Sequence, residues 1–509
     1  MSTAAHWTAW GVFAFFFALV TLLGFAAARW KKADLNYLHE WGLGGRRFGT
    51  AITWFLLGGD LYTAYTVIAV PALVYATGAY GFFALPYTIV AFPVFYVFAP
   101  RLWNVCHRHA YVTLADFAQG RYGNRWLALA VAVTGVLATL PYIALQLVGM
   151  QVVFEAMGFG GLRQGAEIAL IVAFVLLAVY TYTSGLRAPA MIAFVKDTMI
   201  YIFVIAAVIV VPAKLGGYGA VFAAADHAFT AKGGTAGILL HSGQAMPFAS
   251  LAFGSALALF LYPHAATGML AAANAGSLRR NAMLLPAYSL LLGLIALIGY
   301  MAIAAQVDAK GTAIVPALIL QSFPEWFAGF CCAAIALGAL VPAAIMSIGA
   351  ANLVTRNIWR PYINADITPA QEAQVAKVTS LVVKFGALAF VVFLPMQYAI
   401  DLQLLGGIWI SQIFPPIAFG LFTRWFRPGG LLAGWAVGMA LGSTLSWIEG
   451  VKPVYPLPVM GNVYIGLIAL VTNIVVAAAI TAIANARGTA RAPDATAAND
   501  YEDAVATRS

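Results

Sequence analysis

Apolar residues dominate this chain in runs of about twenty, and polar residues collect in short segments between those runs. A run of that length crosses the hydrocarbon core of a bilayer as an α-helix, whereas the strands of a membrane barrel alternate polar and apolar positions. The pattern therefore predicts an all-α membrane protein with 13 transmembrane helices. The expected limits are 8–28, 50–78, 82–99, 126–154, 167–183, 189–212, 246–270, 282–304, 325–355, 377–397, 402–422, 430–449 and 463–484.

The second expected span, Thr50 to Gly78, is interrupted near its middle. Gly58 and Gly59 are followed directly by Asp60, and Pro71 adds a second disruption. Each glycine weakens a helix by roughly 1 kcal/mol relative to alanine, and a carboxylate at that depth has to face protein or water rather than lipid. We interpret the segment as a broken helix of the kind that secondary transporters use to bind ions and substrates. A tightly packed helix with a structural aspartate is the alternative.

A matching interruption lies in the seventh expected span. Gly254 and Ser255 precede Pro263 and His264, and Pro263 frees the carbonyl of Leu259 because proline lacks a backbone donor. Corresponding interruptions five helices apart predict an inverted repeat with a site between its halves. The expected divisions are an extra N-terminal helix and cytoplasmic loop (1–49), the repeat core (50–422), two C-terminal helices (423–484) and a disordered cytoplasmic tail (485–509).

Composition supports the membrane class, and charge predicts the orientation. The 509 residues are 63% hydrophobic and only 9% charged. The net charge of +9 is spread over loops, with no basic helix, so no nucleic-acid partner is predicted. With the N-terminus outside, the inner loops hold 19 lysines and arginines and the outer loops hold 5. The positive-inside rule then places the C-terminus in the cytoplasm.

Other candidate chemistry is sparse. Cys106, Cys331 and Cys332 form no disulfide framework. His107 and His109 lie in a basic inner loop, and we predict no metal binding there. No soluble catalytic domain is present, so we do not expect an enzyme.

Motifs along nearly the whole chain resemble the sodium:solute symporter family. They are the broken helix at Gly58, Gly59 and Asp60; Thr113-Leu114-Ala115-Asp116-Phe117 with Gly120-Arg121-Tyr122-Gly123; Tyr142, Gln146, Leu147 and Gly149; Tyr180-Thr181 with Gly185-Leu186-Arg187-Ala188; Pro263-His264 and Arg279-Arg280; and Gly420-Leu421-Phe422 with Gly430 and Gly434. The stretch from Val341 to Trp359 is most similar to the bacterial monocarboxylate permeases of that family. The resemblance implies a LeuT-like five-plus-five fold in the bacterial inner membrane and import of lactate, pyruvate, acetate or a related acid.

Four positions of this sequence match the positions of the sodium ligands in that family. The resemblance implies cation binding by Gly58, Leu61, Ala344 and Ser347 through carbonyl and hydroxyl oxygens, which hard cations prefer. Ile348 stands where relatives commonly have a hydroxyl, which predicts weak sodium binding. Sodium is the expected coupling ion, with no cofactor and no other metal. The alternative coupling ion is a proton carried by Asp60. The alternative for Ser347 is a purely structural role, in which its hydroxyl only bonds back to a helix carbonyl.

Lys196 and Asp197 lie within the sixth expected span, one turn after Ala193, where some relatives carry a sodium-binding aspartate. A lysine at that depth needs a partner or an escape to the interface. It either snorkels to the inner surface or takes part in coupling by pairing with Asp60 or attracting an anionic substrate.

Polar groups at mid-depth are the candidates for substrate binding, since a half-helix end and neutral donors can hold a carboxylate. They are Tyr62, Thr63, Thr66, Tyr142, Gln146, Ser255 and Tyr262, with Gly59 and Pro263 as the expected gating breaks. The alternatives are a sodium symporter for another solute, such as an amino acid or a pantothenate-like acid, and a membrane sensor. The functional unit is expected to be a monomer.

Overall fold

The fold is a bundle of long helices. The computed structural model describes residues 7–30, 34–63, 65–158, 165–309, 311–393 and 396–503. Within these ranges, 12 helices are long and apolar enough to cross a membrane. The segment from Thr50 to Thr77 is not among them because its break leaves only short pieces. The all-α membrane architecture is confirmed, whereas the total of 13 spans stays a prediction.

The long helices are α1 (Trp7–Ala26), α5 (Ala84–Arg108), α7 (Arg125–Ala156), α8 (Gly165–Ser184), α9 (Arg187–Lys214), α14 (Pro286–Ala304), α16 (Glu325–Val354), α18 (Pro369–Phe393), α19 (Met396–Ser411), α21 (Pro428–Ile448) and α22 (Ile465–Ala486). The shorter helices outside the two interrupted spans are α2 (Leu38–Leu43), α6 (Leu114–Tyr122), α10 (Tyr218–Lys232), α13 (Ala275–Leu284), α15 (Ile314–Ser322), α17 (Arg360–Tyr362) and α20 (Phe414–Ala418). Strands β1 (Val454–Leu457) and β2 (Gly461–Tyr464) form an antiparallel hairpin that the hydropathy pattern does not predict.

The two interrupted spans lie side by side in opposite directions. The first is α3 (Thr50–Gly59), a π-helical turn (Tyr65–Ala69) and α4 (Val70–Thr77). The second is α11 (Ala245–Ala258), a 3-10 turn (Leu259–Leu261) and α12 (Pro263–Leu270).

Backbone bridges tie the two interrupted spans together at both ends. Phe48, before α3, pairs with Ala272, after α12, and Gly78, after α4, pairs with Gly237, before α11. The amide of Ala79 also donates to the carbonyl of Gly237 at 2.8 Å. The start of each span therefore lies beside the end of the other, so the two spans run antiparallel, as an inverted repeat requires.

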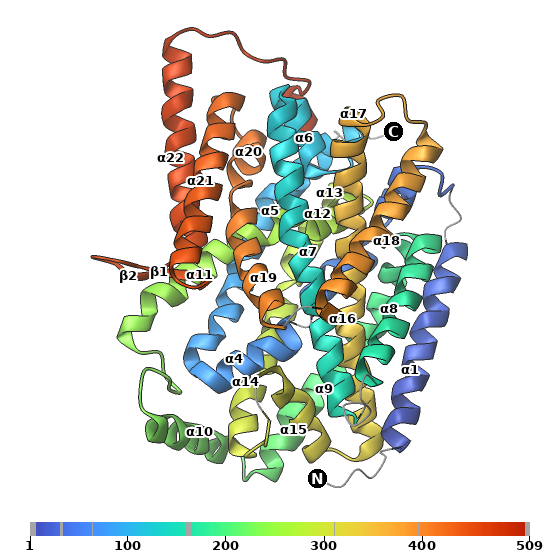
Figure 1. Ribbon diagram of the computed structural model, residues 1–509, viewed down its shortest axis with the longest axis vertical. Helices are drawn as coiled ribbons and strands as arrows, with labels where there is room; N and C mark the ends of the chain where they lie inside the picture. Colours follow the sequence, from blue (N-terminus) through green and yellow to red (C-terminus); the bar gives the residue numbers. More distant parts are fainter. Residues whose placement is uncertain are drawn as a thin grey trace.

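Helix α16 forms the centre of the bundle and is enclosed along its whole apolar stretch. Helices α1, α7, α9 and α18 all pack on it. Its many alanines and glycines allow this because small side chains let helix backbones approach closely. A β-carbon on Gly329, for example, would come within 2.3 Å of the carbonyl oxygen of Ala9. In Figure 1 the hairpin of α21 and α22 stands at one edge of the bundle and α1 at the other.

The outward faces of the helices carry large apolar side chains, including Phe15, Leu22, Ile209 and Val382. Exposed apolar surface on this scale is unfavourable in water, but it is what the hydrocarbon core of a bilayer requires. The chain is therefore a multi-pass membrane protein, as its hydropathy predicts.

Residues 487–503 belong to the segment for which composition predicts a disordered cytoplasmic tail. In the structure they cross one end of the bundle, and Tyr501 is buried there. Arg279 Nη1 lies 2.6 Å from Asp503 Oδ2, and Asn104 donates to Asp503 Oδ1 at 3.0 Å. The hydrogen bond from Arg279 holds the pKa of Asp503 below its usual value. A polar composition predicts disorder only when no complementary surface is available, and here Arg279 and Asn104 belong to such a surface.

The first prediction concerns topology. The charge bias and an odd number of spans predict that reporters fused in the loop at residues 78–82 and at the C-terminus report opposite sides of the membrane, outside and inside. Paired alkaline phosphatase and fluorescent protein fusions measure this. Both fusions reporting the same side would show that the span count is wrong.

Candidate functional site

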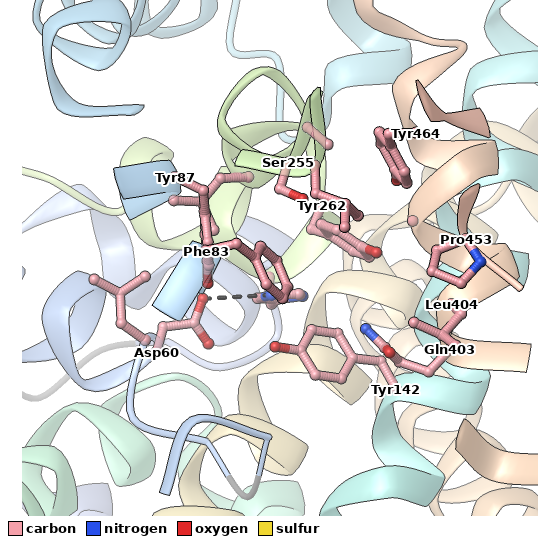
Figure 2. Close-up of a pocket in the computed structure, with 16 residues that line it drawn as sticks. Asp60, Phe83, Tyr87, Tyr142, Ser255, Tyr262, Gln403, Leu404, Pro453 and Tyr464 are labelled. Atoms are coloured by element: carbon pink, nitrogen blue, oxygen red, sulfur yellow. Dashed lines mark ion pairs between the residues drawn. The ribbon is translucent and has the colours of Figure 1, made fainter. Parts of the chain in front are cut away.

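A cavity of about 120 Å³ lies where the two helix breaks meet. It extends toward Pro453 and Tyr464 of the loop between α21 and α22 (Figure 2). Its polar side chains come from six separate segments: Asp60, Tyr87, Tyr142, Ser255, Tyr262, His264, Gln403 and Tyr464. The apolar part of the wall includes Leu61, Phe83, Leu251, Leu259 and Leu404. The space suits a solute of a few heavy atoms, since one water molecule takes up about 30 Å³ of liquid volume.

The charged group in the wall of this cavity is Asp60, the first residue after α3. Its Oδ2 atom lies 3.5 Å from Nε2 of His264, the second residue of α12; the His264 side chain is buried and that of Asp60 is 9% exposed. The contact joins the two helix breaks directly. Asp60 Oδ1 and His264 Nδ1 have no hydrogen-bond partner among the described residues. Buried polar atoms normally have partners, so these two atoms are available to a bound solute or ion.

Aromatic rings line the space beside this pair. The ring centroids of Tyr142 and Tyr262 lie 5.7 Å apart, and both rings contact His264 at 5.6 and 5.3 Å. Figure 2 shows the hydroxyl end of Tyr142 pointing toward the Asp60 carboxylate. Ser255, from α11, faces the same cavity. The structure thus brings three of the substrate candidates, Tyr142, Ser255 and Tyr262, to one cavity with the coupling candidate Asp60.

Three other candidates stabilise the first break instead of lining the cavity. Thr66 Oγ1 accepts from the amide of Thr63 at 2.9 Å and donates to the carbonyl of Leu61 at 2.7 Å. The buried hydroxyl of Tyr62 donates to the carbonyl of Tyr288 at 3.2 Å. These bonds satisfy polar groups that the interrupted helix leaves unpaired, which a membrane interior requires.

Gln146 also lies outside the cavity wall. Its side-chain amide donates to the carbonyl of Tyr142, one turn earlier on α7, at 3.3 Å. Gln146 is fully buried and supports the helix that carries Tyr142.

Lys196 does not snorkel to the surface. It is fully buried, its ammonium donates to the carbonyl of Gly59, and its Nζ lies 2.9 Å from Asp197 Oδ1. Tyr288 donates its hydroxyl to Asp197 Oδ2 at 2.8 Å. The lysine therefore pairs with its neighbour and not with Asp60, and it reaches the backbone of the first break.

The two glycines before Asp60 make room for this cluster. A β-carbon on Gly58 would lie 2.1 Å from the ring of Tyr288, and one on Gly59 would lie 2.7 Å from Asp197 Oδ2. Neither contact is possible for a side chain. The glycines thus serve close packing against α9 and α14 in addition to ending the helix.

The expected cation ligands occur as two adjacent pairs. On α3, the carbonyl of Gly58 accepts from the amide of Leu61 at 2.9 Å. On α16, Ser347 Oγ donates back to the carbonyl of Ala344 at 2.7 Å. This bond back to its own helix is what a purely structural role of Ser347 would require. Assembly of all four into one site stays a prediction.

Sequence reasoning missed several cavity residues. His264 is visible in the sequence only as part of a family motif, although its place beside Pro263 puts it at the break. Tyr87, Gln403 and Tyr464 come from segments far from both breaks. No local signal marks them, because only the packing of α5, α19 and the β2 strand brings them to the cavity.

Comparison with known proteins agrees with this geometry. The model of the sodium:solute symporter family matches residues 41–438. The chain belongs to that family and is a transporter of small solutes. It is 57% identical to a monocarboxylate transport permease protein of Rhizobium johnstonii, covering 97% of this chain and all of that protein. It is 36% identical to the uncharacterized symporter YodF of Bacillus subtilis, covering 82% and 84% of the two chains.

A solved structure supports the fold. It is a Na⁺-coupled sialic acid symporter in a substrate-bound outward-open state, with a TM-score of 0.76 over 94% of this chain and 97% of that one. At 16% identity the likeness concerns the fold alone. It confirms the LeuT-like architecture that the two interruptions predict.

The second prediction tests the close packing at the break. Gly58→Ala places a methyl group against the Tyr288 ring, and overpacking of this kind costs about 1–3 kcal/mol. The purified variant should unfold several degrees below the wild type in detergent. Gly11→Ala is the matched control, because nothing lies within 4 Å of its new β-carbon. Equal melting temperatures for Gly58→Ala and the wild type would contradict the packing.

Proposed function

We propose that this protein imports a short monocarboxylate, such as lactate, pyruvate or acetate, together with a cation. The observation that carries the proposal is the small polar cavity between two helix breaks, with Asp60 and His264 in its wall. The 57% identity to a protein named as a monocarboxylate permease supports the same class of substrate.

The cavity has the donors that a small carboxylate needs. Tyr87, Tyr142, Ser255, Tyr262 and Gln403 offer hydroxyl and amide groups around the space. A carboxylate held by several neutral donors needs no full countercharge. Among the described lining residues there is no lysine or arginine, which favours a small anion over a large acidic sugar.

A cation is required for an electrostatic reason. The Asp60 carboxylate is buried in the wall, so a second carboxylate beside it meets a like charge. Two unit charges 4 Å apart interact by about 4 kcal/mol at an effective dielectric constant of 20. A co-bound cation, or a proton on Asp60, removes that repulsion. Binding of the acid and of the cation then favour each other, which is the basis of symport.

Sodium is the favoured cation, because the family and the structural neighbour are sodium-coupled. We assign it to Gly58, Leu61, Ala344 and Ser347. Lys196, paired with Asp197, would then hold the Gly59 carbonyl and so the geometry of the break. A proton on Asp60 is the competing choice.

We also propose a location and an oligomeric state. The protein lies in the bacterial inner membrane with its N-terminus outside and its C-terminus in the cytoplasm, and one chain forms the transport unit. Import of an amino acid or a pantothenate-like acid on the same scaffold is the alternative. Competition for uptake of labelled lactate by pyruvate, acetate, alanine and proline separates these substrates.

The third prediction is that Asp60 couples the cation to transport. Asp60→Asn keeps the shape and removes the charge, so uptake of labelled lactate into proteoliposomes should fall roughly tenfold or more. Asp226→Asn, on the exposed face of α10, is the control and should transport normally. Accumulation by Asp60→Asn at the wild-type level would show that the residue is structural.

The fourth prediction concerns the ion. Uptake should respond to an imposed sodium gradient, Ser347→Ala should raise the sodium concentration for half-maximal uptake, and Ile348→Ser should lower it by supplying a ligand. The measurement compares sodium and proton gradients in the same proteoliposomes. Uptake that ignores sodium and collapses with an uncoupler would assign the coupling to a proton.

A further inference from the structure

Lys384 is a fully buried lysine that the proposed transport cycle does not use. It lies within α18, and its Nζ donates to Ser380 Oγ, one turn earlier, at 2.6 Å. No carboxylate pairs with it in the described part of the chain. An ammonium in this position is costly, so a role is expected for it.

The hydrogen bonds of Lys384 continue to the expected cation site. Ser380 Oγ donates to Ser347 Oγ at 3.2 Å, and Ser347 Oγ donates to the carbonyl of Ala344 at 2.7 Å. Each hydroxyl accepts one hydrogen bond and donates the next. This series of hydrogen bonds therefore runs in one direction, from the ammonium of Lys384 to the carbonyl of Ala344.

The series of hydrogen bonds from Lys384 uses the same two oxygens, those of Ser347 and Ala344, that the expected sodium site needs. The Ser347 oxygen accepts from Ser380, and the carbonyl of Ala344 accepts from Ser347. Each of these oxygens already accepts one hydrogen bond, which leaves one lone pair for sodium. The Lys384 amine lies only two hydrogen bonds from the Ser347 oxygen, and its protonated form repels a bound sodium ion because the surroundings screen charge poorly.

We propose that Lys384 is a tethered cation of the sodium site, which keeps the affinity of Ala344 and Ser347 for sodium low. The proposal rests on the proposed function only in taking those two residues as cation ligands. Ile348 fits the same picture, because a site already supplied with a positive charge has less need of a further oxygen. Lys384 thus sets the sodium concentration at which the transporter works.

Two substitutions separate the charge from the hydrogen bond. Lys384→Met removes both, whereas Lys384→Gln keeps a donor for Ser380 without the charge. Lys377→Met is the matched control, because Lys377 lies on the same helix and its ammonium faces the ring of Tyr182 instead. The purified full-length proteins are melted in detergent at rising sodium chloride, with potassium chloride holding ionic strength constant. A bound ion raises the melting temperature according to its dissociation constant.

The sodium concentration for half-maximal stabilisation should fall about tenfold or more in Lys384→Met and Lys384→Gln, and should stay at the wild-type value in Lys377→Met. An unchanged or higher concentration in both Lys384 variants, or no sodium-dependent shift in either, would overturn the proposal. The assay contains no organic acid. Loss of monocarboxylate uptake alone would therefore contradict the proposed function and not the role of Lys384.

Discussion

Two helices are broken in the middle of the membrane, and the rest of the site depends on how their exposed polar groups are satisfied. Lipid offers no hydrogen-bond partner for a free carbonyl or carboxylate. At the first break, Thr66 donates a hydrogen bond to the Leu61 carbonyl and Lys196 donates one to the Gly59 carbonyl. Between the two breaks, the side chains of Asp60 and His264 lie 3.5 Å apart. That last contact leaves one buried polar atom of each side chain, Asp60 Oδ1 and His264 Nδ1, without a hydrogen-bond partner among the described residues.

The breaks themselves could be predicted because their causes are local. Two glycines before an aspartate, and a proline at the inner end of the seventh span, each disturb a helix whatever surrounds it. Their equivalent positions then predict the inverted repeat. The cavity wall could be predicted only in part. Tyr142, Ser255 and Tyr262 were found through depth and motif, whereas Gln403 and Tyr464 depend on packing between distant segments.

Where the structure differs from the expectations, the causes are physical as well. Thr63 and Thr66 have the chemistry of ligands, but the Thr66 hydroxyl accepts from the backbone amide of Thr63 and donates to the carbonyl of Leu61. The choice between snorkelling and pairing for Lys196 depended on Asp197 and Tyr288, whose positions hydropathy does not define. The tail was expected to be disordered from its composition, yet its Asp503 pairs with Arg279 of α13.

The central claim is that the cavity between the two breaks binds a short monocarboxylate. An experimental structure of the protein with pyruvate and sodium tests it most directly. The account predicts density for the acid in the cavity, with its carboxylate against the hydroxyls of Tyr142, Ser255 or Tyr262 and close to His264. Density for pyruvate elsewhere in the protein, with this cavity holding only water at saturating pyruvate, would contradict the claim.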